Sequence, residues 1–181
     1  MLRTLSLFAP AVLALTLLSA PALAAGSDSG ESNATKCAKG EAYNNTTKKC
    51  VKKTSALDDD QLLQNAKAFA YAGRYDEALT LLGQIRQPQT AEVYNYLGYA
   101  TRKSGDVEGG LAYYRRALEI DPGYTLARSY MGEALIIAGR RDDALAQLGE
   151  IKERCGMGCR EYVILARALT GVTDSELRQT W

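Results

Sequence analysis

Apolar residues recur at helical spacing through most of the chain beyond residue 58. In residues 91–124, two clusters with this spacing are separated by Ser104-Gly105-Asp106, and Asp121-Pro122 follows the second cluster. A glycine turn breaks a helix, an aspartate can cap the next one, and a proline disfavours helix in the residue before it. Residues 91–124 are therefore predicted to form a helix–turn–helix unit.

The unit recurs on both sides of this segment. Residues 125–158 repeat its apolar and glycine positions at a distance of 34 residues. Residues 59–90 form a copy about two residues shorter, which is anchored by the likeness of GRYDEAL at 73–79 to GRRDDAL at 139–145. A unit of this size does not bury its apolar face alone, so the copies are expected to stack into a helical array.

The repeated unit resembles the tetratricopeptide repeat. The residues at its signature positions are Tyr94, Leu97, Gly98, Thr101, Gly110, Tyr114, Ala117 and Pro122. Gly110 stands where the family usually has alanine, so the second helix is expected to be less rigid there. The resemblance implies an all-α, right-handed solenoid of three helical hairpins over residues 57–158. Residues 159–181 then provide a capping helix, which fits the first helix of a fourth copy, and a C-terminal tail.

Residues 1–24 have the features of a signal peptide. Arg3 precedes an apolar run from Leu5 to Leu18, and Ala22-Leu23-Ala24 offers small residues for cleavage. The alternative, a membrane-spanning anchor, is disfavoured by Pro10 and by the length of the run, because spanning takes about 20 apolar residues. We expect an exported protein, periplasmic in a Gram-negative bacterium or secreted.

A linker and a small cysteine module are expected to follow. Residues 25–36 contain no large apolar residue and are predicted to form a flexible linker. Residues 37–53 are predicted to form a β-hairpin that turns at Asn44-Asn45, since asparagine tolerates positive φ. A disulfide between Cys37 and Cys50 would stabilise this hairpin by about 3 kcal/mol in the chain-entropy model.

The hairpin region is strongly basic. Six lysines in residues 36–53 face a single acidic residue, Glu41. One interpretation is a contact point for cell-wall glycan or another anionic polymer. The alternative is a solvated tail held by its disulfide.

A second cysteine pair lies beyond the third repeat. Cys155 and Cys159 are separated by Gly-Met-Gly, which lets the loop bend enough for the two sulfurs to meet. A redox site usually has two intervening residues, and a zinc site would need better ligand spacing. We expect a structural disulfide here, although four cysteines allow three pairings.

Charge and composition argue against several function classes. Without Arg3, the 22 basic residues of the chain become 21, equal to its 21 acidic residues, so there is no electrostatic case for nucleic acid. The chain has no histidine, no phosphate-binding glycine loop and no distinct carboxylate pair. We therefore expect no enzyme, no catalytic residue, no cofactor and no metal.

The resemblance also suggests a binding surface. In tetratricopeptide arrays, the first helices of successive repeats line a concave groove. Register places ten candidate contacts there: Lys67, Tyr71, Glu92, Asn95, Tyr99, Arg102, Lys103, Ser129, Glu133 and Arg167. Charge, amide and tyrosine together suit a peptide with polar and apolar features, whereas the alternative is that these are ordinary solvated positions. The expected function is a non-catalytic scaffold or adaptor that binds a protein or peptide of unknown identity.

Overall fold

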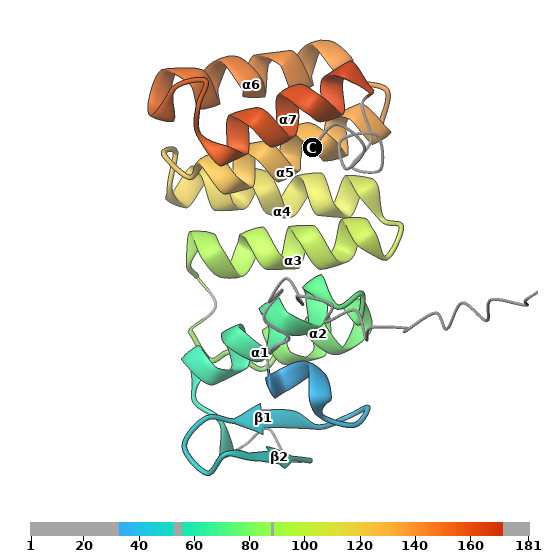
Figure 1. Cartoon of the computed structure of the whole chain (residues 1–181), viewed down its shortest axis with the longest axis vertical. Coiled ribbons are helices and arrows are strands. Elements are labelled where there is room, and N and C mark those ends of the chain that lie inside the picture. The colour runs from blue at the N-terminus through green and yellow to red at the C-terminus, as the bar shows by residue number, and fades with distance from the viewer. Residues whose placement is uncertain (1–32, 53–55, 88, 172–181) are drawn as a thin grey trace, which may run out of the picture. The chain divides into compact units, whose positions relative to one another are not determined.

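A computed structural model describes residues 33–52, 56–87 and 89–171, so the predicted signal peptide and C-terminal tail lie outside the described residues. The described part contains a 3-10 helix, a two-stranded sheet and seven α-helices (Figure 1). Their bounds are η1 Asn33–Lys36, β1 Ala42–Asn44, β2 Lys49–Val51, α1 Asp59–Tyr71, α2 Tyr75–Leu82, α3 Ala91–Lys103, α4 Val107–Ile120, α5 Thr125–Ile137, α6 Arg141–Cys155 and α7 Arg160–Thr170.

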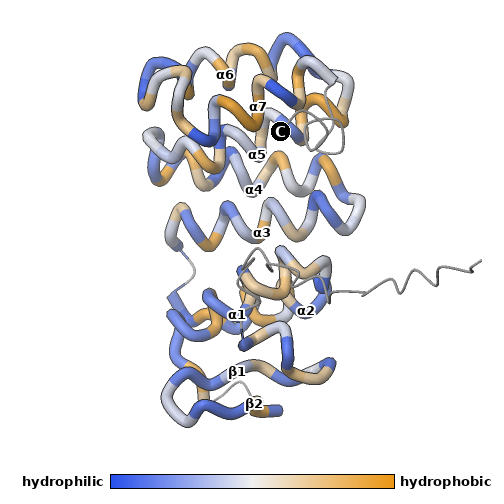
Figure 2. The backbone as a smooth tube through the Cα atoms, in the orientation of Figure 1, coloured by the Kyte–Doolittle hydropathy of each residue, from blue (hydrophilic) through white to orange (hydrophobic). Residues whose placement is uncertain are grey.

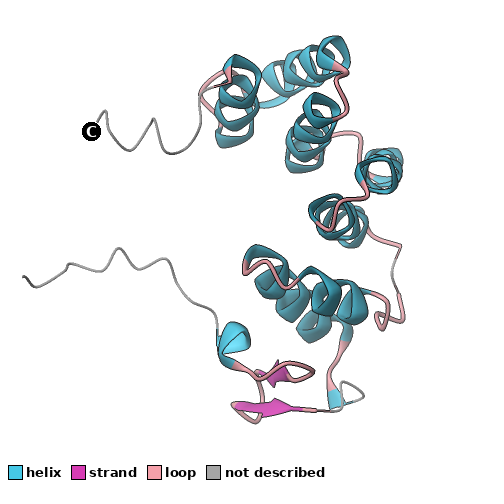
Figure 3. Cartoon of the chain, turned by 90° about the vertical axis from the view of Figure 1, so that its right-hand side faces the viewer, coloured by secondary structure: helices cyan, strands magenta, loops and turns pink. Residues whose placement is uncertain are grey.

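Consecutive helices pack as hairpins. The pairs are α1 with α2, α3 with α4, and α5 with α6, while α7 packs on both α5 and α6 (Figure 3). The prediction of an all-α solenoid with three helical hairpins is confirmed. Since α7 packs on α5 as α5 packs near α3, it occupies the place of the first helix of a fourth repeat.

Local signals set the helix ends. Asp58 and Gln61 form a capping box at the start of α1, and Thr90 accepts a hydrogen bond from the Val93 amide at the start of α3. Asp106 caps α4 through the Gly109 amide, as Ser104-Gly105-Asp106 predicts. The first helix of each repeat ends at a glycine with positive φ, a conformation that glycine adopts without strain: Gly73, Gly105 and Gly139.

Glycines also allow close helix crossing within the second repeat. A Cβ at Gly98 would lie 2.7 Å from Cε1 of Tyr114, and one at Gly110 would lie 3.0 Å from the Gly98 carbonyl oxygen. Gly98 therefore lies where the two helices of this repeat cross. Gly110, where the resemblance leads one to expect alanine, is glycine for a steric reason: a Cβ there would press on Arg102 and the backbone of α3.

The buried apolar residues fall into two clusters. One joins the N-terminal hairpin region with α1, α2 and three residues of α3, and it includes Phe69, Leu82 and Tyr96. The other joins α4, α5, α6 and α7, and it includes Tyr114 and Leu165. Apolar and polar stretches alternate along each helix (Figure 2), as one-sided burial requires.

The N-terminal hairpin is part of the same folded body as the helices. β1 and β2 pair antiparallel with Tyr43 opposite Cys50, and the predicted Cys37–Cys50 disulfide is present with Cα atoms 5.6 Å apart. The turn differs from the prediction. Asn44 belongs to β1 and its side chain accepts from the Thr46 and Thr47 amides, while Lys48 takes the positive φ.

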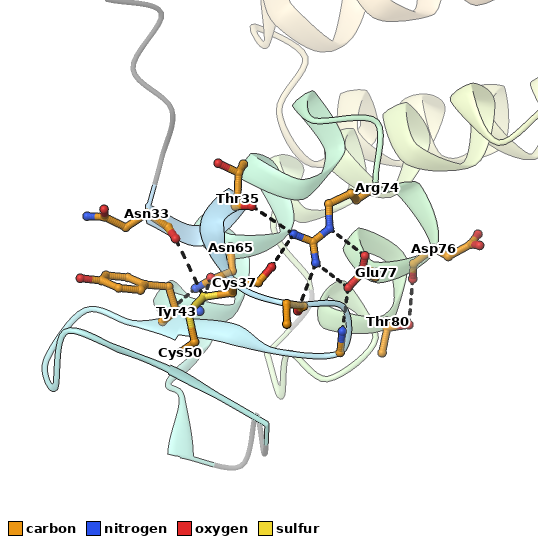
Figure 4. Close-up of polar contacts among 12 residues, drawn as sticks. Asn33, Thr35, Cys37, Tyr43, Cys50, Asn65, Arg74, Asp76, Glu77 and Thr80 are labelled. Carbon is orange, nitrogen blue, oxygen red and sulfur yellow. Dashed lines mark hydrogen bonds and ion pairs between the residues drawn. A yellow bond between two sulfur atoms is a disulfide. The ribbon is translucent and has the colours of Figure 1, made fainter.

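We call residues 33–52 the cap, because they cover the first repeat. The Arg74 guanidinium donates to the carbonyls of Thr35, Cys37 and Ala38, and Glu77 accepts from the Gly40 amide (Figure 4). The prediction of a flexible linker over residues 25–36 is therefore wrong for residues 33–36. Residues 33–36 form η1, which packs on α1 and buries Ala34.

Candidate partner-binding face

The ten predicted contact residues lie on the first helices, as the register implies. Lys67 and Tyr71 are on α1, five residues are on α3, Ser129 and Glu133 are on α5, and Arg167 is on α7. The Tyr71 hydroxyl lies 3.1 Å from the Tyr130 hydroxyl on α5. Neighbouring helix axes are about 8–10 Å apart, so side chains of α1 and α5 meet across α3 only if this face is concave.

Three of the ten residues are corrected by their burial. Asn95 is 0%, Ser129 1% and Arg102 5% exposed, so they do not present side chains to a ligand. Ser129 Oγ donates to the Glu161 carbonyl of α7, a contact between first helices of successive repeats. Asn95 holds the matching position in the second repeat, but among the described residues its amide has no hydrogen-bond partner.

Arg102 is a structural residue that ties three helices together. Its Nη2 donates to Glu133 Oε2 at 3.0 Å, and its Nε donates to the Tyr114 hydroxyl at 3.4 Å. Burial alone would lower the pKa of Arg102, but the attraction of Tyr114 and Glu133 outweighs it and raises the pKa. Arg102 therefore stays charged, and the ion pair joins α3 to α5 from inside the array.

A cluster of four tyrosines, Tyr71, Tyr96, Tyr99 and Tyr130, forms the middle of the concave face. Tyr71 lies edge-on to Tyr96 and Tyr99, with ring centroids 5.9 Å and 5.6 Å away, and the Tyr99 and Tyr130 centroids are 5.0 Å apart. The Tyr71 hydroxyl is 2.9 Å from the Tyr96 hydroxyl as well as close to that of Tyr130. Tyr71 is 55% exposed, so it presents the cluster to solvent.

Tyr96 and Tyr130 are members that sequence reasoning missed. Both residues are mostly buried, at 3% and 8% exposure, and neither is among the ten predicted contacts. A usable signal existed, because the two tyrosines are 34 residues apart and so hold one position of the repeat.

Three tyrosines of this face, Tyr96, Tyr99 and Tyr130, have raised pKa values. Burial raises the pKa of Tyr96 and of Tyr130, and the hydrogen bond of each to Tyr71 raises it further. Burial also raises the pKa of Tyr99. None of these phenols supplies a general base near pH 7, so the cluster suits recognition rather than proton transfer.

The charged residues around the cluster are mostly paired. Lys67 Nζ lies 2.7 Å from Glu92 Oε1 and 5.2 Å from the centre of the Tyr96 ring. Glu133 is engaged by Arg102. Lys103 is exposed, and its ammonium lies 5.9 Å from the Tyr99 ring centre. Both carboxylates of the middle of this face are thus neutralised, while Lys103 is available to a partner.

The second cysteine pair forms the predicted disulfide, at the junction of α6 and α7. The Cys155 and Cys159 sulfurs are bonded, with Cα atoms 5.8 Å apart. A carboxylate oxygen of Glu161 lies near both sulfurs. Disulfide sulfurs are not thiolates, so in this state the pair offers no metal ligand.

The fold and this face define an α-solenoid of helical hairpins with an aromatic concave surface. The tetratricopeptide repeat family model matches residues 102–154, so the chain is similar to that family over this stretch. Among the described residues, no helix is long and apolar enough to span a membrane.

Solved structures show the same fold. A crystal structure of MamA has a TM-score of 0.55 and 20% identity, covering 69% of this chain and 77% of that chain. A second MamA structure has a TM-score of 0.54 and 19% identity, covering 69% and 70%. A search of curated protein sequences found no significant match.

Proposed function

We propose that this protein is a non-catalytic scaffold or adaptor that binds a peptide or protein partner on its concave face, in the bacterial periplasm. The repeat fold supports a protein-interaction scaffold in general. The observation that carries the finer proposal is the tyrosine cluster with its exposed member, Tyr71. Tyrosine gives a large, rigid contact area with a polar tip, and it is enriched at protein interfaces.

Affinity capture from an envelope extract tests the concave face. The test variant is Tyr71→Ala with Lys103→Ala, because both side chains are exposed. The matched control is Tyr113→Ala with Arg115→Ala on α4. We expect proteins captured by the wild type to be lost by the test variant and kept by the control. An unchanged set of captured proteins contradicts the proposal. Arg102→Ala is unsuitable, because it leaves Glu133 without its partner.

Export is supported by the signal-peptide pattern and by the two disulfides, which form in oxidising compartments. Expression in a Gram-negative host followed by cell fractionation and mass spectrometry tests it. We expect a periplasmic protein whose first residue lies near Ala25. An unprocessed chain in the cytoplasm would refute the export proposal.

The cap supports a second candidate, retention at an anionic envelope polymer. Lys36, Lys39, Lys48, Lys49 and Lys52 are all exposed. A hollow of about 270 Å³ beside the cap is bordered by Lys39 and Lys52, but also by Glu41 and Glu77, so its charge is mixed. The concave face therefore has the stronger case.

Lysine substitutions test this candidate better than deletion, since deletion would uncover the first repeat. The variant is Lys48→Ala with Lys49→Ala, and the readout is sedimentation of the purified protein with isolated cell walls. Reduced sedimentation favours retention through the cap, and unchanged sedimentation argues against it.

A further inference from the structure

The hydroxyl groups of the tyrosine cluster have one donor in excess. Tyr71, Tyr96 and Tyr130 bring three O–H groups, and two hydrogen bonds join them through the Tyr71 oxygen. Each bond uses one proton. Among the described residues, one O–H of the three is therefore left without an acceptor. When Tyr96 and Tyr130 both donate to the Tyr71 oxygen, the spare O–H is that of Tyr71, whose exposure puts it within reach of a ligand on the concave face.

The charged side chains around the cluster add donors, because both carboxylates are engaged by cations and one further lysine is exposed. Glu92 is bonded to Lys67, and Glu133 to Arg102. Lys103 is exposed and has no ion pair within the described part of the chain. A ligand for this face should therefore be rich in hydrogen-bond acceptors and poor in donors.

Three side chains near the ends of the first helices of the repeats are exposed: a tyrosine, a lysine and an isoleucine. Tyr71, Lys103 and Ile137 hold the same position in three successive repeats, just before the turn between the two helices. Tyr71 is 55% and Ile137 60% exposed. The surface combines a tyrosine ring platform, an aliphatic side chain and a cation, and it spans three repeats.

We propose that this face binds a proline-rich segment in the polyproline II conformation, with Tyr71 as the central platform. Proline has no N–H, so such a segment offers carbonyl acceptors and few donors, which complements the donor excess described above. Its backbone forms no internal hydrogen bonds, and its rings pack on aromatic side chains. The inference rests on the proposed function, since it names the ligand class of the same face.

Fluorescence anisotropy with a labelled, end-blocked decaproline tests the proposal on the purified, oxidised protein. A blocked glycine–serine peptide of equal length controls for nonspecific binding. A peptide of equal length with a free aspartate C-terminus represents an anionic ligand. We expect saturable binding of decaproline and at least tenfold weaker binding of the other two peptides.

Three variants locate the site. Tyr71→Ala should weaken decaproline binding at least tenfold, and Tyr71→Phe should weaken it less, because it keeps the ring and loses the hydroxyl. Tyr113→Ala on α4 should leave binding within twofold of the wild type. Circular dichroism checks that each variant is folded. We expect the Tyr71 variants to fold, because the Tyr71 side chain is exposed.

The outcomes separate this inference from the proposed function. The proposal of a proline-rich ligand is overturned by any one of three results. Decaproline does not bind, the anionic peptide binds more tightly, or Tyr71→Ala leaves decaproline binding unchanged. If decaproline does not bind, but the Tyr71→Ala, Lys103→Ala variant still fails to capture the proteins that the wild type captures, the face binds another class of ligand. If both experiments fail, the concave face is not the binding surface.

Discussion

The side-chain amide of Asn65 pairs with the main chain of Tyr43 in the way that a neighbouring strand would. Asn65 Oδ1 accepts from the Tyr43 amide at 2.7 Å, and Nδ2 donates to the Tyr43 carbonyl at 2.9 Å and to the Gln61 carbonyl at 2.8 Å. Asn65 is 2% exposed. One buried residue of α1 thus satisfies the inner edge of β1 and fixes the cap on the first repeat.

Asn65→Ala should lower the free energy of unfolding by about 2–4 kcal/mol, because it leaves both polar groups of Tyr43 without partners. Urea unfolding measures the loss, and hydrogen exchange should show faster exchange of the Tyr43 amide. Gln64→Ala, an exposed neighbour on α1, should change the stability by less than about 0.5 kcal/mol. Equal effects of the two variants would show that Asn65 does not hold the cap.

The free energy of unfolding should decrease in acid because Glu77 becomes protonated. Hydrogen bonds from Arg74, and then one from the Gly40 amide, lower the pKa of Glu77 from 4.5 to about 2. The folded protein thus binds this proton less readily than the unfolded chain. The stabilisation is full above about pH 5 and is lost as the pH falls from about 4.5 towards 2. We expect a loss on the order of 1–2 kcal/mol, because nearby solvent screens the pair.

Urea midpoints at about pH 7 and pH 3 measure this loss. Glu77→Gln should be less stable than the wild type at neutral pH and should lose less on acidification. Glu108→Gln, on the exposed first turn of α4, should retain the acid loss of the wild type. If the Glu77 variant keeps the full acid loss, the destabilisation arises at other carboxylates.

Two glycine-to-alanine substitutions should act in opposite directions. Gly98→Ala places a methyl group against the Tyr114 ring and should cost about 1–3 kcal/mol. Gly149→Ala on α6 meets no atom within 4 Å and should stabilise the protein by about 0.5–1 kcal/mol through helix propensity. Thermal unfolding compares both variants with the wild type. A neutral Gly98→Ala would mean that the α3–α4 crossing relaxes easily.

The two disulfides should contribute unequally. Cys37 and Cys50 are 13 residues apart, and Cys155 and Cys159 are 4 apart. The chain-entropy model gives about 3 and about 2 kcal/mol for loops of these sizes. Urea unfolding of the two double alanine variants tests this order. A larger loss at the second pair would imply that α7 depends on its bridge more than the first repeat depends on the cap.

The repeats were predictable because their signals are local. Leu97, Tyr114 and Gly105 report one helical hairpin within 34 residues, and the spacing then locates the others. The docking of the cap was not predictable, because its contacts join distant residues. Asn65 reaches 22 residues back to Tyr43, and Arg74 reaches 37 residues back to Cys37. An asparagine or an arginine within a helical pattern does not indicate which distant main-chain groups its side chain will bind.

The candidate face was predictable in outline only. The repeat register tells which helix face a residue belongs to, but not how deeply the next repeat covers it. Ser129 is buried because α7 packs over it, whereas Tyr71 near the end of α1 stays open. Register also cannot show that Tyr71 would reach Tyr130, two first helices away.

The cap has a consequence for how such an array grows. Repeat proteins lengthen by duplicating a unit, and each new unit needs an uncovered neighbour on which to stack. Here the outer side of the first repeat is occupied by η1 and β1. A duplicated unit therefore has no place ahead of Asp59, and extension is confined to the interior of the array and to the side of α7. The cap therefore prevents a further repeat from stacking on the outer side of the first repeat.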